Sequence, residues 1–118
     1  MSIPNDRRNR RARWGGTSPD TGFDCSGFVQ YVFRQAVGFT LPRSSFDQIH
    51  LGASVARDEL QPGDLVFFNT MRATASHVGI YIGENRFIHA PSRGKNVEIG
   101  NFDSYWKARY DGARRLPL

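Results

Sequence analysis

The sequence predicts an α+β domain in which the helices come first and an antiparallel sheet follows. One stretch after Asp24 repeats apolar residues at helical spacing, and short β-rich runs separated by turn residues fill the second half of the chain. Helices and strands do not alternate along the sequence, as they would in a parallel sheet built from βαβ units. We therefore expect a sheet of about five antiparallel strands with the helices packed against it.

The first predicted element is a helix over residues 25–37. Its apolar side chains recur every three or four residues, namely Phe28, Val29, Val32, Phe33, Ala36 and Val37. Asp24 is a residue type that caps helix N-termini, and Gly38 is one that ends helices in the left-handed conformation. A second, short helix is expected to run from Ser44 or Ser45 to about His50.

The second half of the chain contains the predicted strands. They are expected at residues 65–68, 77–83, 86–90, 96–99 and 112–116, and each is rich in residue types that favour strands. Loop-forming residues separate these runs. Residues 104–110 predict a short helix or turn that leads into the last strand.

Length and composition indicate one globular domain. The chain has 118 residues, of which 39% are hydrophobic and 13% aromatic, so it can bury an ordinary core. Most of the net charge of +5 comes from arginines near the N-terminus, namely Arg7, Arg8, Arg10, Arg11 and Arg13. We therefore expect a basic, flexible arm over residues 1–13 and a single domain over residues 14–118.

The composition also favours some classes of partner over others. No aromatic stacking platform or recognition helix accompanies the basic arm, so a nucleic-acid partner is not expected. Binding of nucleic acid by the arginines of the arm is the least favoured alternative. No run approaches the roughly 20 apolar residues of a membrane-spanning helix, and the first residues lack the apolar core of a signal peptide. We expect a soluble monomer without a transmembrane segment. A signal or anchor segment removed earlier stays possible.

Cys25 is the only cysteine of the chain, so no intrachain disulfide can form. It is expected in the first turn of the predicted helix, where the helix dipole and unpaired backbone N–H groups favour thiolate over thiol. The same N–H groups could hold the oxyanion that develops during acyl transfer. A lone cysteine on an apolar helix face is more often structural than catalytic, so Cys25 by itself does not identify an enzyme.

Two histidines in the strand region favour a catalytic role for Cys25 over a structural one. If residues 83–85 form a three-residue hairpin loop, Ile82 pairs with Arg86, and the same register places His77 and His89 on one face of the sheet. Such diagonal neighbours have backbones roughly 7–8 Å apart, close enough for two imidazole rings to meet. A two-residue loop would instead place the histidines on opposite faces. The predicted site therefore depends on the register of this hairpin.

The three side chains together predict a relay for nucleophilic catalysis. His77 would deprotonate Cys25, and His89 would bond the far nitrogen of His77 and so fix its tautomer and orientation. A zinc site from Cys25, His77, His89 and His50 is the competing interpretation. Zinc sites usually contain closely spaced ligand pairs, which are absent here, so no metal and no other cofactor is expected.

Five sequence blocks stand out by their order and spacing. They are WGGTSPDTGFDCSGFVQYVF, LPRSS, PGDLVFF, SHVGIYIG and FIHAP, and they span roughly residues 14–115. Together they resemble the NlpC family of papain-like cell-wall cysteine peptidases. The resemblance implies a papain-like fold in which the nucleophile helix packs on the sheet. It also implies that peptidoglycan stem peptides are hydrolysed through a thioester acyl-enzyme, commonly between D-glutamate and a diamino acid such as diaminopimelate.

The resemblance carries roles onto individual residues of this chain. It implies Cys25 as nucleophile, His77 as base and His89 as the orienting third residue, which are the roles reached above from the residues themselves.

The resemblance also implies a substrate cleft around the nucleophile. Asp24 and Ser26 would lie near the free amine end of the stem peptide, and Ser76 and Arg43 would lie nearby; these four are the candidate substrate-binding residues. An N-cap role is an equal alternative for Asp24, and Ser76 and Arg43 could as easily be structural.

One departure from the family pattern raises a further alternative. Ala12 stands where many members carry a tyrosine that is thought to assist at the oxyanion or substrate side. A wall-binding module with a weakened site is therefore one alternative, and a related cysteine amidase or acyltransferase on another acyl substrate is a second. Asp64 is expected to be a turn or strand-start residue without a chemical role. The motifs fit an enzyme of the bacterial cell envelope, periplasmic or secreted after removal of a signal segment, or a protein that a phage or toxin system delivers to the wall.

Overall fold

The computed structural model describes residues 17–18, 22–91 and 96–118. The predicted basic arm of residues 1–13, and Ala12 within it, lie outside the described residues. The flexibility of the arm and the effect of Ala12 therefore stay predictions.

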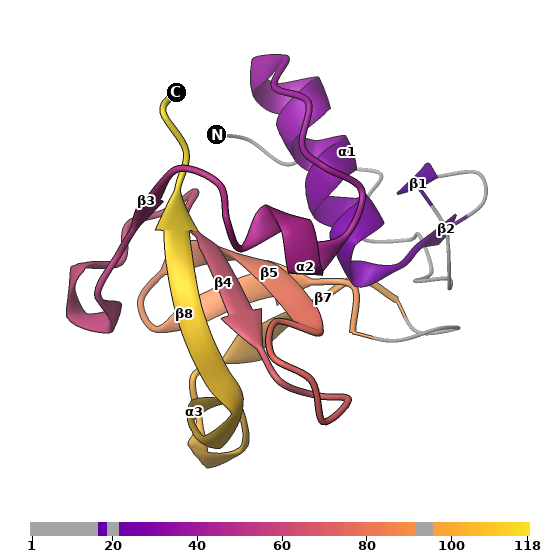
Figure 1. The fold of residues 1–118 in the computed structure, drawn as a ribbon. Coiled ribbons are helices and arrows are strands. Elements are labelled where there is room, and N and C mark those ends of the chain that lie inside the picture. Colours follow the sequence, from indigo (N-terminus) through magenta and orange to yellow (C-terminus); the bar gives the residue numbers. More distant parts are fainter. Residues whose placement is uncertain (1–16, 19–21, 92–95) are drawn as a thin grey trace.

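The described chain contains a long helix followed by short helices and a sheet (Figure 1). In chain order the elements are β1 (Thr17–Ser18), β2 (Gly22–Phe23), α1 (Cys25–Val37), α2 (Ser45–Gln48), β3 (Ala53–Ser54), a 3-10 turn (Arg57–Glu59), β4 (Leu65–Phe68), β5 (His77–Gly83), β6 (Arg86–His89), β7 (Glu98–Asn101), α3 (Ser104–Arg109) and β8 (Tyr110–Arg115). The predicted α+β fold is confirmed.

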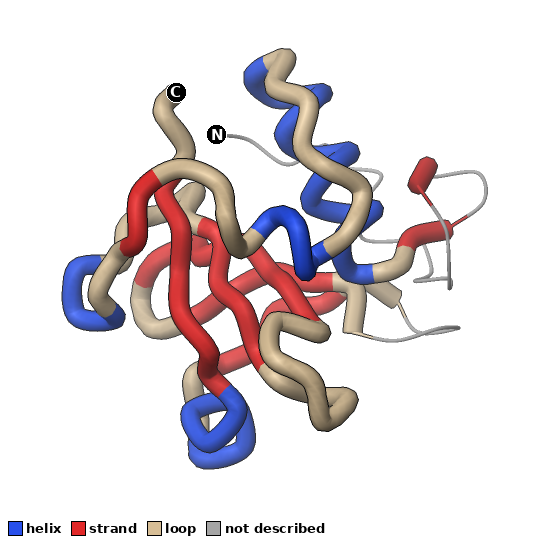
Figure 2. The backbone as a smooth tube through the Cα atoms, in the orientation of Figure 1, coloured by secondary structure: helices blue, strands red, loops and turns tan. Residues whose placement is uncertain are grey.

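The sheet has six strands in the order β3-β8-β4-β5-β6-β7, and the described pairs are antiparallel. Figure 2 shows the strands in red and the helices in blue. Five of these strands correspond to the predicted runs, although β7 begins two residues later than expected and β8 begins two residues earlier. The sixth, β3, has only two residues and pairs with the end of β8. A strand this short carries no alternation of apolar residues, which is why the sequence did not reveal it.

Helix α1 begins and ends where its capping residues predict. A carboxylate oxygen of Asp24 accepts a hydrogen bond from the backbone N–H of Gly27 at 2.8 Å, and Gly38 follows the helix with φ 68°. That left-handed conformation is accessible to glycine without steric cost. Helix α2 is shorter than predicted, because it ends at Gln48 and the chain continues as turns through His50.

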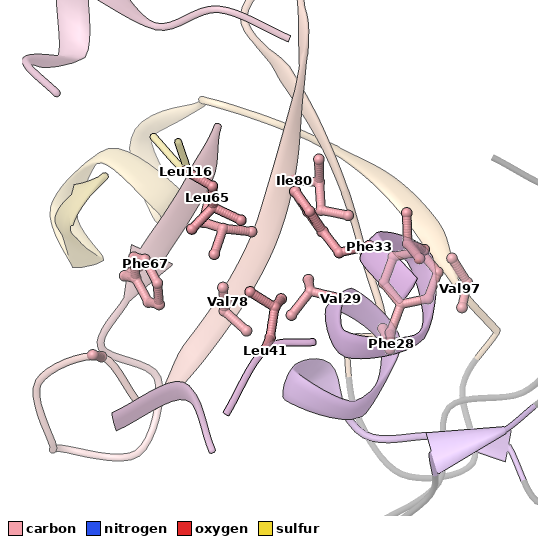
Figure 3. Close-up of a cluster of buried hydrophobic side chains, with 13 residues drawn as sticks. Phe28, Val29, Phe33, Leu41, Leu65, Phe67, Val78, Ile80, Val97 and Leu116 are labelled. Carbon is pink, nitrogen blue, oxygen red and sulfur yellow. The ribbon is translucent and has the colours of Figure 1, made fainter. Parts of the chain in front are cut away.

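Helix α1 packs across one face of the sheet, and a second apolar cluster covers the other face. In the first cluster, side chains of the helix such as Phe28 and Phe33 interdigitate with sheet residues such as Val78 and Ile80 (Figure 3). The second cluster is aromatic and includes Phe68, Phe87 and Phe102, with Trp106 and Tyr110 packed against it. The sheet is thus buried on both sides near its centre, which fixes the positions of β5 and β6.

The β5–β6 hairpin reaches the predicted register by a different route from the one expected. Glu84 and Asn85 both have positive φ, 54° and 62°, and form a two-residue turn, so Gly83 pairs with Arg86. A register shift after Tyr81 then inserts one unpaired residue into β5. The predicted three-residue loop is therefore wrong, but the bulge compensates for the shorter turn and restores the predicted alignment of the two histidines.

Candidate active site

Cys25 is the first residue of α1, and its side chain lies where β5 begins. Its thiol donates a weak hydrogen bond to the carbonyl oxygen of Ser76, 3.9 Å away. Backbone N–H groups of Val78, Ser26 and Cys25 itself lie near enough to the sulfur to favour its thiolate form. These groups belong to the first turn of the helix and to the start of β5, so the thiol lies between both elements.

Burial raises the pKa of the Cys25 thiol above its ordinary value, and the negative charge of Asp24 adds to the rise. The backbone N–H groups around the sulfur lower the pKa but do not offset these effects. The N–H groups at the helix N-terminus favour thiolate as expected, but desolvation outweighs them, so the net shift of the pKa is upward. The resting form of Cys25 is the thiol, and a neighbouring base must take its proton before it can attack.

His77 begins β5, His89 ends β6, and their rings meet on one face of the sheet. The Nε2 atom of His77 lies 2.8 Å from the Nδ1 atom of His89, which is hydrogen-bonding distance. The rings are nearly perpendicular, with an interplanar angle of 84°. Because Nε2 of His77 is engaged by His89, Nδ1 is the nitrogen left to accept a proton from the cleft.

Small and aromatic residues enclose the histidine pair. A Cβ atom at Gly79 would come within 3.2 Å of the Cβ atom of His89, so glycine leaves the space in which the two rings meet. Trp106 of α3 stacks on His77 with an interplanar angle of 25° and meets His89 edge-on, at centroid distances of 5.5 and 5.2 Å. The indole ring thereby limits the rotation of both imidazoles.

Burial sets the protonation state of both histidines. It lowers the pKa of His77 to about 4 and that of His89 to about 3, and for His89 the neighbouring His77 contributes as well. Both rings are therefore neutral at neutral pH. A neutral imidazole has one nitrogen free to accept a proton, so His77 rests in the form that a general base requires.

A cleft of about 900 Å³ brings the thiol and His77 to one surface. Its lining includes all the residues that the sequence predicted for substrate binding together with the nucleophile and base, namely Asp24, Cys25, Ser26, Arg43, Ser76 and His77. His89 is fully buried behind His77 and does not face the cleft. The rest of the rim carries exposed apolar side chains, among them Phe46, Met71 and Tyr105.

Comparison with known proteins identifies the family. A family model described as the NlpC/P60 family matches residues 9–115. The chain belongs to the NlpC/P60 family. The resemblance inferred from the five sequence blocks is confirmed.

Relatives of this NlpC/P60 chain include named hydrolases. Murein DD-endopeptidase MepH of Escherichia coli K12 is 47% identical over 108 residues, and gamma-DL-glutamyl hydrolase of Bacillus subtilis 168 is 50% identical over 105 residues. These matches cover 88% and 87% of this chain but only 40% and 25% of the relatives, so the chain spans less than half the length of either.

Solved structures agree with this assignment. An NlpC/P60 family protein from Bacillus cereus superposes with a TM-score of 0.83 at 38% identity, covering 92% of this chain and 36% of that chain. The NlpC/p60 domain of the peptidoglycan hydrolase SagA superposes with a TM-score of 0.76 at 35% identity, covering 90% of this chain and 86% of that chain.

Three of the predicted substrate-binding residues of this NlpC/P60 domain form one hydrogen-bonded group. The guanidinium of Arg43 donates to a carboxylate oxygen of Asp24 at 2.7 Å and to the hydroxyl of Ser26 at 2.8 Å. Asp24 also caps α1, so the N-cap role and a place in the cleft wall are both realised. Because the pair is partly exposed, its polar atoms remain accessible to a ligand.

Ser76 has a structural task in addition to its place in the cleft lining. Its hydroxyl oxygen accepts hydrogen bonds from the backbone N–H groups of Thr70 and Met71, at 2.9 and 3.1 Å. The side chain thus folds the β4–β5 loop along the cleft. Its single O–H donor is the group left for a substrate.

The sequence did not single out the aromatic and apolar part of the site. Trp106 contacts both histidines, and Tyr105, Phe46 and Met71 line the rim. The only signal available was the aromatic pair in the predicted 104–110 helix or turn. Nothing in that local pattern indicates contact with strands that are far away in the sequence.

Asp64 and His50 lie away from the cleft. Asp64 is buried and accepts two hydrogen bonds from the guanidinium of Arg115, both at 2.9 Å, which fits a structural residue. His50 is exposed after α2 and does not line the cleft. Among the described residues no group of three or more His, Cys, Asp or Glu side chains is arranged to hold a metal ion. Nor does any described helix have the length and apolar character needed to cross a bilayer.

Proposed function

We propose that this chain is a cysteine endopeptidase that hydrolyses peptidoglycan stem peptides at the bacterial cell wall. The bond proposed is the one between D-glutamate and a diamino acid such as diaminopimelate. The observation that carries the proposal is the hydrogen bond of 2.8 Å between His77 and His89, with His77 and Cys25 lining the same cleft. Family membership and the printed names of the relatives support the substrate class.

The first chemical step transfers a proton from Cys25 to His77. The S–H bond breaks, an N–H bond forms at Nδ1 of His77, and the sulfur attacks the carbonyl carbon of the scissile bond. Thiolate and imidazolium form together, so their opposite charges stabilise each other where burial disfavours either charge alone. The hydrogen bond to His89 holds the imidazole in the orientation that this transfer requires.

Backbone N–H groups at the start of α1 are suited to the oxyanion. The N–H of Gly27 is capped by the side chain of Asp24, and the N–H of Phe28 bonds to the Asp24 carbonyl. The N–H groups of Cys25 and Ser26 lie beside the sulfur, so they are the donors nearest to a carbonyl oxygen bound there.

The second half of the reaction regenerates the thiol. The imidazolium of His77 donates its proton to the leaving amine as the carbon–nitrogen bond breaks, and a thioester remains on Cys25. Water then attacks the thioester while His77 takes one of its protons. That proton passes from His77 to the departing sulfur, so the thiol of Cys25 is regenerated and a carboxylic acid is released without a cofactor.

The cleft offers separate groups for the two ends of a peptide. The carboxylate of Asp24, the hydroxyl of Ser26 and the guanidinium of Arg43 present charged and polar atoms that suit the free amine and carboxylate of a short peptide. The apolar rim suits the methylene chain of a diamino acid.

Defined muropeptides test the proposal directly. The parent protein and a Cys25→Ala variant would be incubated with a free stem tripeptide, a disaccharide-linked stem peptide and a D,D-cross-linked dimer, and the products identified by mass spectrometry. We expect the parent alone to cleave between D-glutamate and the diamino acid. Cleavage of the cross-link instead would correct the bond, and cleavage by both proteins would exclude Cys25 as the nucleophile.

A parent protein that cleaves none of these substrates would contradict the proposed function. Alkylation of Cys25 by iodoacetamide near neutral pH then separates the alternatives. A reactive thiol indicates an amidase or acyltransferase with another acyl substrate, whereas an unreactive thiol together with binding to sacculi indicates a wall-binding module.

A further inference from the structure

The Nε2 atom of His89 is buried and faces strand β7. It has no hydrogen-bond partner among the described residues. Glu98 of β7 is the direct cross-strand neighbour of His89, and its Oε1 atom lies 3.8 Å from Nε2. A buried ring nitrogen without a hydrogen-bond partner lowers the free energy of unfolding, so a nearby polar group is expected to bond to it.

The space around this nitrogen is shaped to admit the carboxylate. Gly100 lies two residues after Glu98, and a Cβ atom there would come within 3.1 Å of Nε2 and within 2.6 Å of the ring of Phe87. The side chain of Glu98 is 58% exposed, so its rotation is not blocked by packing. A separation of 3.8 Å is too long for a hydrogen bond and too short to hold a water between the two atoms. A shift of less than about 1 Å brings the two atoms to hydrogen-bonding distance.

The position of the proton on His89 decides whether His77 can act as a base. Each neutral imidazole carries one proton, and a single proton occupies the hydrogen bond between Nε2 of His77 and Nδ1 of His89. If His77 supplies that proton, its Nδ1 is bare and can accept the proton of Cys25. If His89 supplies it, the proton of His77 sits on Nδ1, and that nitrogen cannot accept the proton of Cys25.

We propose that Glu98 is a positioning residue that keeps the proton of His89 on Nε2 and thereby keeps Nδ1 of His77 free to deprotonate Cys25. This inference rests on the proposed roles of Cys25 and His77. The carboxylate accepts a hydrogen bond only from a protonated Nε2, so it selects one of the two tautomers of the pair. No proton moves beyond His77 during the reaction.

The tautomers can be measured on the free protein. The chain has three histidines, so its ring nitrogens labelled with ¹⁵N give a spectrum simple enough to assign, with His50→Gln identifying the exposed ring. We expect His77 and His89 to carry their protons on Nε2 in the parent. In Glu98→Ala we expect a second population with protons on Nδ1, and about a fivefold fall in the rate of Cys25 alkylation at neutral pH.

Two variants separate this role from a general effect of charge or folding. Glu98→Gln keeps an acceptor oxygen and is expected to keep the parent tautomers. Glu84→Gln removes a carboxylate from the exposed β5–β6 turn, where the side chain is 84% exposed, and is expected to change neither tautomers nor alkylation. Thermal unfolding of all variants checks that the fold is retained.

The inference is overturned if His77 carries its proton on Nδ1 in the parent, or if Glu98→Ala has the parent tautomers and alkylation rate. Neither measurement uses peptidoglycan. A parent protein with the expected tautomers that fails to cleave muropeptides would therefore overturn the proposed substrate while leaving the role of Glu98 intact.

Discussion

The two walls of the cleft differ in burial and in charge. The helix wall, formed by Asp24, Ser26 and Arg43, is charged, hydrogen-bonded and partly exposed. The sheet wall presents His77, with His89 buried behind it, and both rings are neutral at neutral pH. Water screens the charges of the helix wall. The low dielectric around the sheet wall strengthens the interaction between any charges that form there.

From this difference we expect the helix wall to bind substrate and the sheet wall to take part in proton transfer. Charged groups that remain hydrated can exchange water for a polar ligand at small cost, which suits recognition. A base that is buried and neutral becomes charged only when an opposite charge appears beside it, which suits a paired transfer with Cys25. Substitutions in the sheet wall are therefore expected to change kcat, and substitutions in the helix wall to change KM.

The largest effect is expected from His77→Gln. The amide cannot accept the proton of Cys25 at neutral pH, so kcat should fall by about 10²- to 10⁴-fold while KM changes little. Steady-state hydrolysis of a defined muropeptide measures both quantities, and a thermal melt checks folding. If the variant retains kcat but loses affinity for the substrate, His77 serves binding rather than proton transfer, which would contradict the difference between the two walls.

A smaller effect is expected on stability at acid pH. Because the folded state lowers the pKa of His77 to about 4 and that of His89 to about 3, the unfolded chain binds more protons below about pH 6.5. The free energy of unfolding should therefore fall as the pH decreases from about 6.5 toward 4, by about 3 kcal/mol from His77 alone. Urea unfolding at a series of pH values measures this dependence. In His77→Gln part of the dependence should disappear, and an unchanged slope would mean that other groups cause it.

Trp106→Leu should weaken the sheet wall without removing a titrating group. Loss of the stacked indole frees the ring of His77, and we expect kcat to fall by about tenfold with KM nearly constant. Trp106→Phe keeps an aromatic face and should lose less. If both variants raise KM and preserve kcat, the indole serves as a substrate platform instead.

The smallest effect is expected from Arg43→Lys in the helix wall. Lysine cannot bridge Asp24 and Ser26 in the fork geometry of a guanidinium, but the pair is exposed, so KM should rise by no more than about fivefold. Arg86→Lys is a matched control, because its side chain is equally exposed, at 42%, and pairs with Glu84 away from the cleft. An equal rise in KM in both variants would exclude a specific role for Arg43.

Local patterns predicted most of the fold and that the rings of His77 and His89 meet. Capping residues and helical periodicity located α1, and the β-rich runs located five strands of the sheet. What the sequence missed has two causes, because the two-residue turn and its bulge are local backbone geometry, whereas the other misses depend on tertiary surroundings. The raised pKa of Cys25 follows from burial that no local window reveals, and the contact of Trp106 with His77 joins segments far apart in sequence.

The β5–β6 hairpin has a consequence for how the two histidines are kept in register. Its two-residue turn and the extra residue after Tyr81 cancel each other, so both histidines stay in phase. If Ile82 instead paired in the ladder while the two-residue turn stayed, the pairing beyond it would shift by one residue and turn one histidine away from the other. The meeting of the two rings therefore depends on a single unpaired residue in the strand rather than on a side chain of the cleft.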